Sequence, residues 1–277
     1  MSKLSLSQFA GMNIHYCHFP FDYFLNSMVN LGINNIELWA ASPHFYINDL
    51  TPTLIRKFKK QIKDRNLNLV CLTPEQCVYP INIAAREDYL RERSINYFYK
   101  NIELASELNS PIMLVTPGCG YFSDSNKEAW ALSRDSLRKL IIKAEKLGVI
   151  LALEPISPYN SNIINEVNGL KKMLTEINSP FLKGIMDLGQ MAILHEKIED
   201  YLMSLGDDLI HIHFIDSNKQ GAHLALGDGI LPLQSYIEKL SNSKYCKYLT
   251  LEIDDRKYCL NPEKAMKKSI DKLKELL

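Results

Sequence analysis

Short apolar runs alternate with longer amphipathic segments along the whole chain. Eight runs have the composition of buried β-strands, at residues 6–12, 35–40, 68–74, 111–118, 149–155, 182–189, 209–216 and 248–254. The segments between them carry apolar residues every three or four positions, which is the spacing of an amphipathic helix, for example at 52–66, 88–109 and 133–148. The pattern therefore predicts eight successive strand–helix units.

Eight such units predict an α/β protein with the (β/α)₈ TIM-barrel fold. Near-continuous apolar strands indicate a parallel sheet that is covered on both faces. No linker or low-complexity segment interrupts the 277 residues, and α/β barrels commonly reach this size, so we expect one catalytic domain over residues 1–277. An open doubly wound sheet is the alternative, but no glycine-rich phosphate-binding turn follows the first strand.

Charge and composition argue against nucleic acid and membranes as binding partners. The 32 Lys and Arg residues balance 32 Asp and Glu residues, so no net positive charge attracts nucleic acid or anionic lipid. The chain has neither an apolar run of membrane-spanning length nor a signal peptide, which favours a cytoplasmic protein without a membrane partner. The six cysteines form no C-x-x-C pair, and we expect them to be small buried hydrophobic residues.

Ionisable residues stand at the ends of the last four predicted strands. They are Glu154 in "LALEP", Asp187 in "IMDLG", His213 in "HIHFID" and Glu252 in "LTLEI". In a TIM barrel the carboxyl ends of the strands meet at one face, where catalytic groups gather. Each residue alone could be a helix cap or part of a surface ion pair. Their occurrence at equivalent positions of four consecutive units predicts a common site.

Three carboxylates that converge in this way would repel one another unless a cation lay among them. Three oxygen ligands and one imidazole suit a single divalent metal ion, with Mn²⁺, Co²⁺ or Mg²⁺ favoured and Zn²⁺ as the alternative. His211 lies two residues before His213, on the same face of the strand. We interpret His211 as a core histidine, the alternative being a partner of the site that lies deeper in the barrel.

Five stretches carry a family resemblance that extends through essentially the whole chain: "LGINNIELWAASPH", "LTPEQCVYP", "LALEPISPYNSN", "LGDDLIHIHFIDS" and "LGDGILPL". They resemble the sugar isomerase/epimerase group of metal-dependent TIM barrels, in particular its ketose and fructoselysine 3-epimerases. The resemblance implies that Glu154, Asp187, His213 and Glu252 bind the metal, and that Glu154 and Glu252 are the catalytic acid/base pair. It further implies an isomerase that inverts C3 of a ketose or ketosamine through an enediolate, in a homo-oligomer.

Three positions depart from the pattern of the epimerases that act on free ketoses. Where those enzymes have a second Glu, a His and an Arg, this chain has Asn160, Gln190 and Lys219. The residues that hold the metal are unchanged, whereas those that grip the sugar differ. The departures favour a ketose that carries an additional group, as in fructoselysine or psicoselysine, over free tagatose or psicose.

Several residues near the predicted strand ends are candidates for binding the substrate: Trp39, His44, Glu75, Tyr159, Gln190, Lys219 and His223. The structural alternatives are loop packing for Trp39 and His44, a helix or loop cap for Glu75, and an exposed loop aromatic for Tyr159. His15, His18 and His195 are expected to be structural, with His195 in a helix.

Other functions remain to be distinguished from C3 epimerisation. Aldose–ketose isomerases and hydroxypyruvate isomerases use a similar metal site and a similar intermediate. A phosphodiester hydrolase like endonuclease IV needs many histidines for its three zinc ions, and this chain has seven. A barrel that only binds a sugar is the third alternative, and loss of turnover with retained ligand binding in a Glu252→Gln variant would argue against it.

Overall fold

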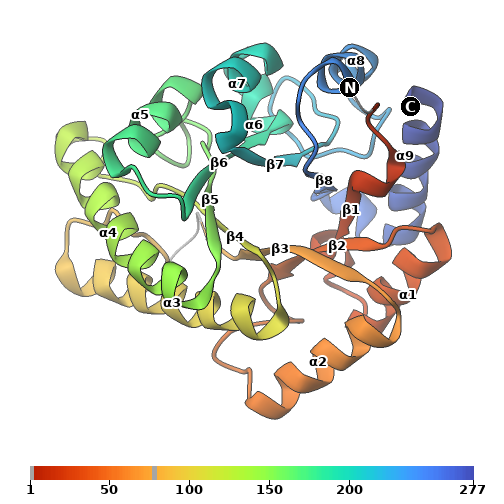
Figure 1. Cartoon of the computed structure of the whole chain (residues 1–277), viewed down its shortest axis with the longest axis horizontal. Helices are drawn as coiled ribbons and strands as arrows, with labels where there is room; N and C mark the ends of the chain where they lie inside the picture. Colours follow the sequence, from red (N-terminus) through yellow and green to blue (C-terminus); the bar gives the residue numbers. More distant parts are fainter. Residues whose placement is uncertain (1–2, 77–79) are drawn as a thin grey trace.

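The computed structural model describes residues 3–76 and 80–277. Eight parallel strands form a closed barrel in chain order, which confirms the predicted TIM barrel (Figure 1). They are β1 (Phe9–Met12), β2 (Asn35–Ala40), β3 (Asn68–Pro74), β4 (Ile112–Val115), β5 (Ile150–Leu153), β6 (Leu182–Asp187), β7 (Leu209–His213) and β8 (Tyr248–Leu251). The barrel closes where β1 pairs with β8, with Ala10 opposite Thr250.

Helices surround the barrel on its outside (Figure 1). They are α1 (Phe21–Leu31), α2 (Pro52–Asp64), α3 (Asp88–Leu108), α4 (Asn126–Leu147), α5 (Val167–Ile177), α6 (Leu188–Ile193), α7 (Ile198–Leu205), α8 (Leu233–Asn242) and α9 (Pro262–Leu276). The two ends of the chain lie close together, since Lys3 Nζ donates a hydrogen bond of 3.2 Å to the carbonyl of Leu277.

All the predicted strands except β2 and β3 are shorter than their apolar patterns indicated, and β1 and β6 are two examples. Residues 6–8 form a 3₁₀ turn instead of the beginning of β1, because Gln8 Oε1 accepts a hydrogen bond of 3.1 Å from the Ser5 amide. Residues 188–189 begin α6 instead of ending β6. Asp187 caps this helix by accepting a hydrogen bond of 2.7 Å from the Gln190 amide. Local capping therefore sets the beginning of β1 and the end of β6.

The apolar core has two parts. The larger lies between the strands and the surrounding helices, and the smaller fills the barrel with side chains that include Ala10, Val70 and Ile185. Gly11 allows β1 to approach α1 closely, because a Cβ atom at this position would lie 2.3 Å from Met28 Sδ. A larger residue at position 11 would force the Met28 side chain to move in this closely packed region.

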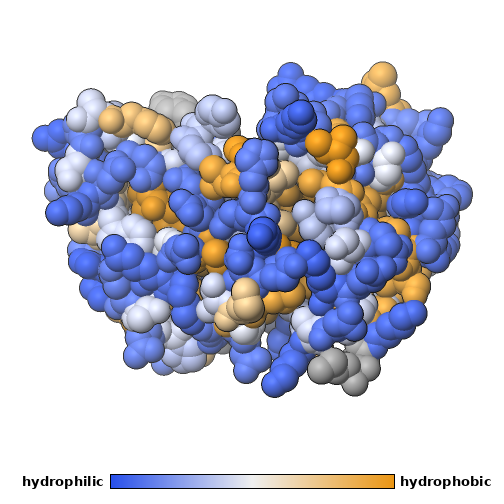
Figure 2. Space-filling model, turned by 90° about the horizontal axis from the view of Figure 1, so that it is seen from above, coloured by the Kyte–Doolittle hydropathy of each residue, from blue (hydrophilic) through white to orange (hydrophobic). Residues whose placement is uncertain are grey.

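On the face that Figure 2 shows, hydrophilic residues predominate, and the hydrophobic residues lie largely between them. Of the helices in the described residues, none is both long and apolar enough to cross a bilayer.

Two of the histidines expected to be structural differ sharply in environment. The side chain of His15 is fully buried, and its ring packs against Tyr16 with 4.6 Å between the ring centroids. Burial lowers the pKa of His15 to about 3. His195 is not helical as predicted, since it lies exposed in the turn between α6 and α7 with φ at +56°.

The buried His15 predicts a loss of stability in acid. Its pKa is lower in the folded chain than in the unfolded chain, so the unfolded chain takes up a proton first as the pH falls. From about pH 6.5 to about pH 5 this removes about 2 kcal/mol from the free energy of unfolding. A His15→Phe variant should lose that part of the pH dependence in urea unfolding.

The matched control is His195→Asn, which removes an exposed histidine at a position where Asn tolerates the backbone angle. This variant should keep the pH dependence of the wild type. If His15→Phe also keeps it, His15 is not the group responsible.

Candidate metal and active site

Glu154, Asp187, His213 and Glu252 converge at the carboxyl ends of β5 to β8. One ligand atom from each of the four side chains lies within 4.8 Å of the others. Asp187 and His213 are the last residues of neighbouring strands and are paired in register, while Glu154 and Glu252 directly follow β5 and β8. The barrel register therefore brings together four residues that are widely separated in sequence.

The imidazole of His213 is at the centre of this cluster. Its Nδ1 lies 2.7 Å from Glu252 Oε2, 3.2 Å from Glu154 Oε1 and 3.4 Å from Asp187 Oδ2. On the other side of the ring, Nε2 lies 3.1 Å from Glu37 Oε1. Since a carboxylate can only accept a hydrogen bond, Glu37 fixes a proton on Nε2, so that Nδ1 is the ring nitrogen that faces the three carboxylates.

Glu37 is a site residue that the sequence analysis missed. It lies inside the barrel on β2, fully buried, and also accepts hydrogen bonds from Thr73 and from His211 Nε2, the latter at 2.7 Å. Burial opposes its ionisation, but His213 and His211 outweigh this effect and hold the pKa of Glu37 well below its usual range. The signal in the sequence was a single charged residue between the apolar residues of "NIELWA".

His211 lies in the barrel core, and it also contacts Glu37, the carboxylate that is hydrogen-bonded to His213. Its Nε2 lies 3.0 Å from Thr250 Oγ1 as well as close to Glu37. His211 is therefore both a core histidine and a deeper partner of the site, because it helps to hold the carboxylate that orients His213.

The pKa values of Glu154, Glu252 and His213 differ strongly from their usual values. Burial raises the pKa of Glu154 to about 7. Burial opposes ionisation of Glu252 too, but His213 and His223 lower its pKa to about 2. Burial disfavours a charge on His213, yet Glu252 and Glu37 hold its pKa well above the usual value. The cluster therefore draws positive charge to its centre.

A divalent cation fits this cluster. Among the described residues, Asp187 Oδ2 and His213 Nδ1 are buried polar atoms without a hydrogen-bond partner. Both face the space between the four side chains, and an unpartnered buried carboxylate oxygen is costly. A metal ion bound by three carboxylates and one imidazole would satisfy both atoms and balance the charge.

His223 is brought to the edge of the cluster by the loop after β7. Its Nδ1 lies 3.1 Å from Glu252 Oε2, and its Nε2 lies 3.5 Å from Asp187 Oδ1. Burial would lower the pKa of His223, but Asp187 and Glu252 raise it to about 10. Gly189 provides the space, since a Cβ atom there would lie 2.8 Å from the His223 ring.

The glycine-rich part of the same loop folds around a buried carboxylate. Asp216 accepts backbone hydrogen bonds of 2.9 Å from both Gly227 and Gly229 and one of 3.1 Å from Leu231. A Cβ atom on Gly229 would lie 2.3 Å from Asp216 Oδ1. This close approach explains the glycine there and fixes the course of the loop that carries His223.

Trp39 and Glu75 form one wall of the barrel mouth. Trp39 Nε1 donates a hydrogen bond of 3.0 Å to Glu75 Oε2. Burial raises the pKa of Glu75, and the charges of Asp254 and Glu252 add to this effect. Glu75 therefore lies within electrostatic reach of the cluster. Both residues also line a groove of about 950 Å³ that extends along α3.

His44 and Gln190 make structural contacts. His44 Nδ1 lies 3.0 Å from Asn13 Nδ2, and its Nε2 lies 2.7 Å from the carbonyl of Phe19, so both nitrogens contact protein. Gln190 Oε1 accepts a hydrogen bond of 2.7 Å from the Ser157 amide and so ties α6 to the loop after β5. Their part in substrate binding stays a prediction.

Tyr159 and Lys219 lie on exposed turns. The Tyr159 side chain is 84% exposed, and Lys219 is exposed in the loop after β7. The structure thus places Trp39, Glu75 and His223 around the cluster, and these two residues at its periphery.

Fold and site together define a TIM barrel with a possible metal-binding cluster at its mouth. The sequence matches the family described as Xylose isomerase-like TIM barrel over residues 25–276. This chain belongs to that family, which confirms the resemblance seen in the sequence.

Individual relatives agree with this assignment. The chain is 27% identical to the fructoselysine 3-epimerase of Shigella flexneri over 260 residues, which covers 93% of this chain and 94% of the relative. It is 22% identical to a probable endonuclease 4 of Halothermothrix orenii, over 72% of this chain and 76% of that protein. The crystal structure of a D-psicose 3-epimerase with D-tagatose, from Clostridium cellulolyticum H10, superposes with a TM-score of 0.81 and 15% identity, over 98% and 99% of the two chains.

The Glu37–His213 contact predicts a measurable effect on metal affinity. A Glu37→Gln variant keeps the shape of the side chain but removes the charge that fixes the His213 proton. We expect its affinity for Mn²⁺ to fall about 10- to 100-fold, as is typical when a partner of a metal-bound histidine is lost. Isothermal titration calorimetry on the metal-free protein measures this.

Glu75→Gln is the matched control, because Glu75 is at the barrel mouth without contacting His213, and it should bind Mn²⁺ as the wild type does. Equal affinity in a folded Glu37→Gln variant would show that Glu37 does not orient the ligand.

Proposed function

We propose that this protein is a metal-dependent epimerase that inverts C3 of a ketose or ketosamine. The observation that carries the proposal is the convergence at one barrel mouth of four side chains that could hold a metal ion, two of which are the glutamates that follow β5 and β8. Glu154, Asp187, His213 and Glu252 would hold one divalent ion. Donors that are mostly carboxylate oxygens favour Mn²⁺, Co²⁺ or Mg²⁺ over Zn²⁺.

The bound ion would supply Lewis-acid stabilisation of negative charge on the substrate's ketone oxygen during proton transfer. The protein's own contribution is a pair of carboxylates in different environments. In the metal-free protein, the charges of His213 and His223 lower the pKa of Glu252, whereas burial raises the pKa of Glu154. Two carboxylates with separated pKa values are suited to serve as base and acid.

Epimerisation at C3 requires that a proton leave one face of the sugar and that another be delivered to the opposite face. Glu252, which follows β8, is paired with His223, while Glu154 follows β5. In one direction of reaction Glu252 takes the C3 proton and Glu154 gives a proton back. In the reverse direction the two exchange roles.

The groove beside Trp39 and Glu75 supports a substrate that is larger than a free ketose. It continues from the barrel mouth along one face of α3, whose lining residues are Tyr89, Glu92, Arg93, Asn96, Tyr97 and Lys100. These positions recur every three or four residues and carry polar or aromatic side chains. We infer that the substituent of a ketosamine lies here.

The charges along the groove fit an amino-acid substituent. Glu75 is the acidic group nearest the barrel mouth, where the amine of a ketosamine would be placed. Further along, Lys100 Nζ donates a hydrogen bond of 3.0 Å to Asn48 Oδ1, and Arg93 donates one of 2.9 Å to the carbonyl of Pro80. Both cations could also bind a carboxylate. The 27% identity with fructoselysine 3-epimerase is consistent with this assignment.

The alternatives receive less support from the site. Aldose–ketose and hydroxypyruvate isomerases would use the same cluster but act on C1 and C2, so the position of proton exchange separates them. A three-zinc hydrolase such as endonuclease IV needs many histidine ligands. In the described residues, only His213 and His223 have ring nitrogens that contact the carboxylates of the cluster.

Solvent exchange tests the reaction directly. With Mn²⁺ and fructoselysine in D₂O, the protein should introduce deuterium at C3, which NMR spectroscopy detects. Deuterium at C1 or C2 would instead identify an aldose–ketose isomerase. The Glu252→Gln variant should lose exchange by at least about 100-fold while still binding the sugar, since acid–base catalysis supplies about that factor or more. No exchange with any ketose or ketosamine would refute the proposal.

The groove predicts a separate effect on substrate preference. Lys100→Met removes a cation from the groove without touching the cluster, so KM for fructoselysine should rise about tenfold, in line with the loss of one charged hydrogen bond. The kcat for fructoselysine and the activity on free fructose should stay the same.

Lys146→Met, at the exposed carboxyl end of α4, is the matched control and should change neither value. If Lys100→Met lowers activity on free and substituted ketoses alike, the groove does not bind the substituent.

A further inference from the structure

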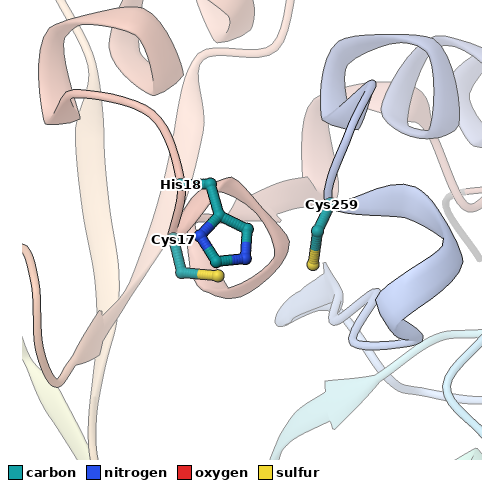
Figure 3. Close-up of side chains that lie close together, drawn as sticks. All are labelled: Cys17, His18 and Cys259. Carbon is teal, nitrogen blue, oxygen red and sulfur yellow. The ribbon is translucent and has the colours of Figure 1, made fainter.

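A second group of metal-binding side chains lies outside the cluster described above. Cys17 and His18 follow the 3₁₀ turn Ile14–Tyr16 in the connection from β1 to α1, and Cys259 follows the 3₁₀ turn Arg256–Tyr258 in the connection from β8 to α9. In Figure 3 the three side chains face a common space, with Cys17 and His18 on the N-terminal segment and Cys259 on the C-terminal one.

The geometry of this group is close to that of a metal coordination sphere. The two Sγ atoms and one ring nitrogen of His18 all lie within 4.8 Å of one another. Around a tetrahedral Zn²⁺, with Zn–S near about 2.3 Å and Zn–N near about 2.0 Å, ligand atoms are about 3.5–3.8 Å apart. A small movement of three side chains on loops would therefore close the sphere.

We propose that Cys17, His18 and Cys259 form a second metal site, which binds a thiophilic divalent cation such as Zn²⁺. Two thiolates and an imidazole are soft and borderline donors, whereas the cluster at the barrel mouth is mainly carboxylate. The two sites therefore differ in the metal that they select. Three protein ligands leave one position of a tetrahedral ion for water or an external ligand.

The local surroundings support a cation at this place. A divalent cation would bind both sulfur atoms as thiolates. Cys17 and Cys259 are both partly buried, which limits but does not block access.

The position of the site suggests what it does. It would join the connection after the first strand to the one after the last strand, where β1 and β8 close the barrel. A metal bridge between such distant parts of the chain constrains the unfolded state strongly. The same β8 connection reaches the catalytic side, since the Asp254 amide donates a hydrogen bond of 3.2 Å to the carbonyl of His223.

Cobalt spectroscopy tests the site independently of any sugar reaction. Co²⁺ added to the metal-free, fully reduced protein should produce a thiolate-to-cobalt charge-transfer band in the near ultraviolet. The carboxylate–histidine cluster contains no thiolate, so it cannot give this band. Cys17→Ser and Cys259→Ser should each lose most of the band, and His18→Ala should shift it and weaken binding of Co²⁺ at least tenfold.

Two controls make the result specific. Cys246→Ser removes an exposed thiol elsewhere and should leave the band unchanged. The Asp187→Asn/Glu252→Gln double variant should also keep it, which separates this site from the proposed catalytic one. Absence of the band in folded wild-type protein, or its persistence in the Cys17→Ser/Cys259→Ser double variant, would overturn the proposal. So would a spontaneous Cys17–Cys259 disulfide that forms in air and a reduced form that does not bind Co²⁺.

Discussion

The concentration of negative charge at the barrel mouth is the constraint on which the site depends. Glu154, Asp187 and Glu252 all approach His213 Nδ1 within 3.4 Å, in a space largely closed to water. Coulomb repulsion among buried carboxylates is severe, so such a group persists only with a compensating cation. A proton on His213 can provide one charge, and a divalent metal ion provides two while also using the unpartnered oxygen of Asp187.

The rigid barrel, rather than attraction among the four side chains, holds the carboxylates close together. Parallel pairing of β5 to β8 fixes the ends of the strands, and the apolar core outside the barrel fixes the strands themselves. Inside the barrel, Glu37 connects His213 to His211 and Thr73 by hydrogen bonds. This buried network sets the ring orientation before a metal binds, which lowers the cost of forming the site.

The sequence pattern was sufficient for the barrel and for the four converging residues, because both follow from periodicity. Apolar runs define the strands, and a polar residue at the end of each run is brought to one face by the fold. The role of Glu37 could not be predicted in this way, because Glu37 lies within a strand and its contacts exist only in the closed barrel. The proximity of Cys17 and His18 to Cys259 could not be predicted from the sequence for a related reason, since only the pairing of β1 with β8 brings their two connections together.

Local hydrogen bonding also decided features that periodicity could not. The 3₁₀ turn at residues 6–8 and the beginning of α6 at Leu188 depend on single caps within apolar runs. The groove along α3 depends on how a polar helix face is placed relative to Trp39 and Glu75. The proposal that this groove holds the substituent of a ketosamine depends on that placement, and so does the part given to the departures at Asn160, Gln190 and Lys219.

The central claim is that one divalent ion is bound by Glu154, Asp187, His213 and Glu252. Anomalous diffraction from crystals grown with Mn²⁺ tests it most directly. We expect a single strong peak between these four side chains, within about 2.0–2.4 Å of each ligand atom. Full Mn²⁺ occupancy elsewhere, with no peak at the barrel mouth, would contradict it.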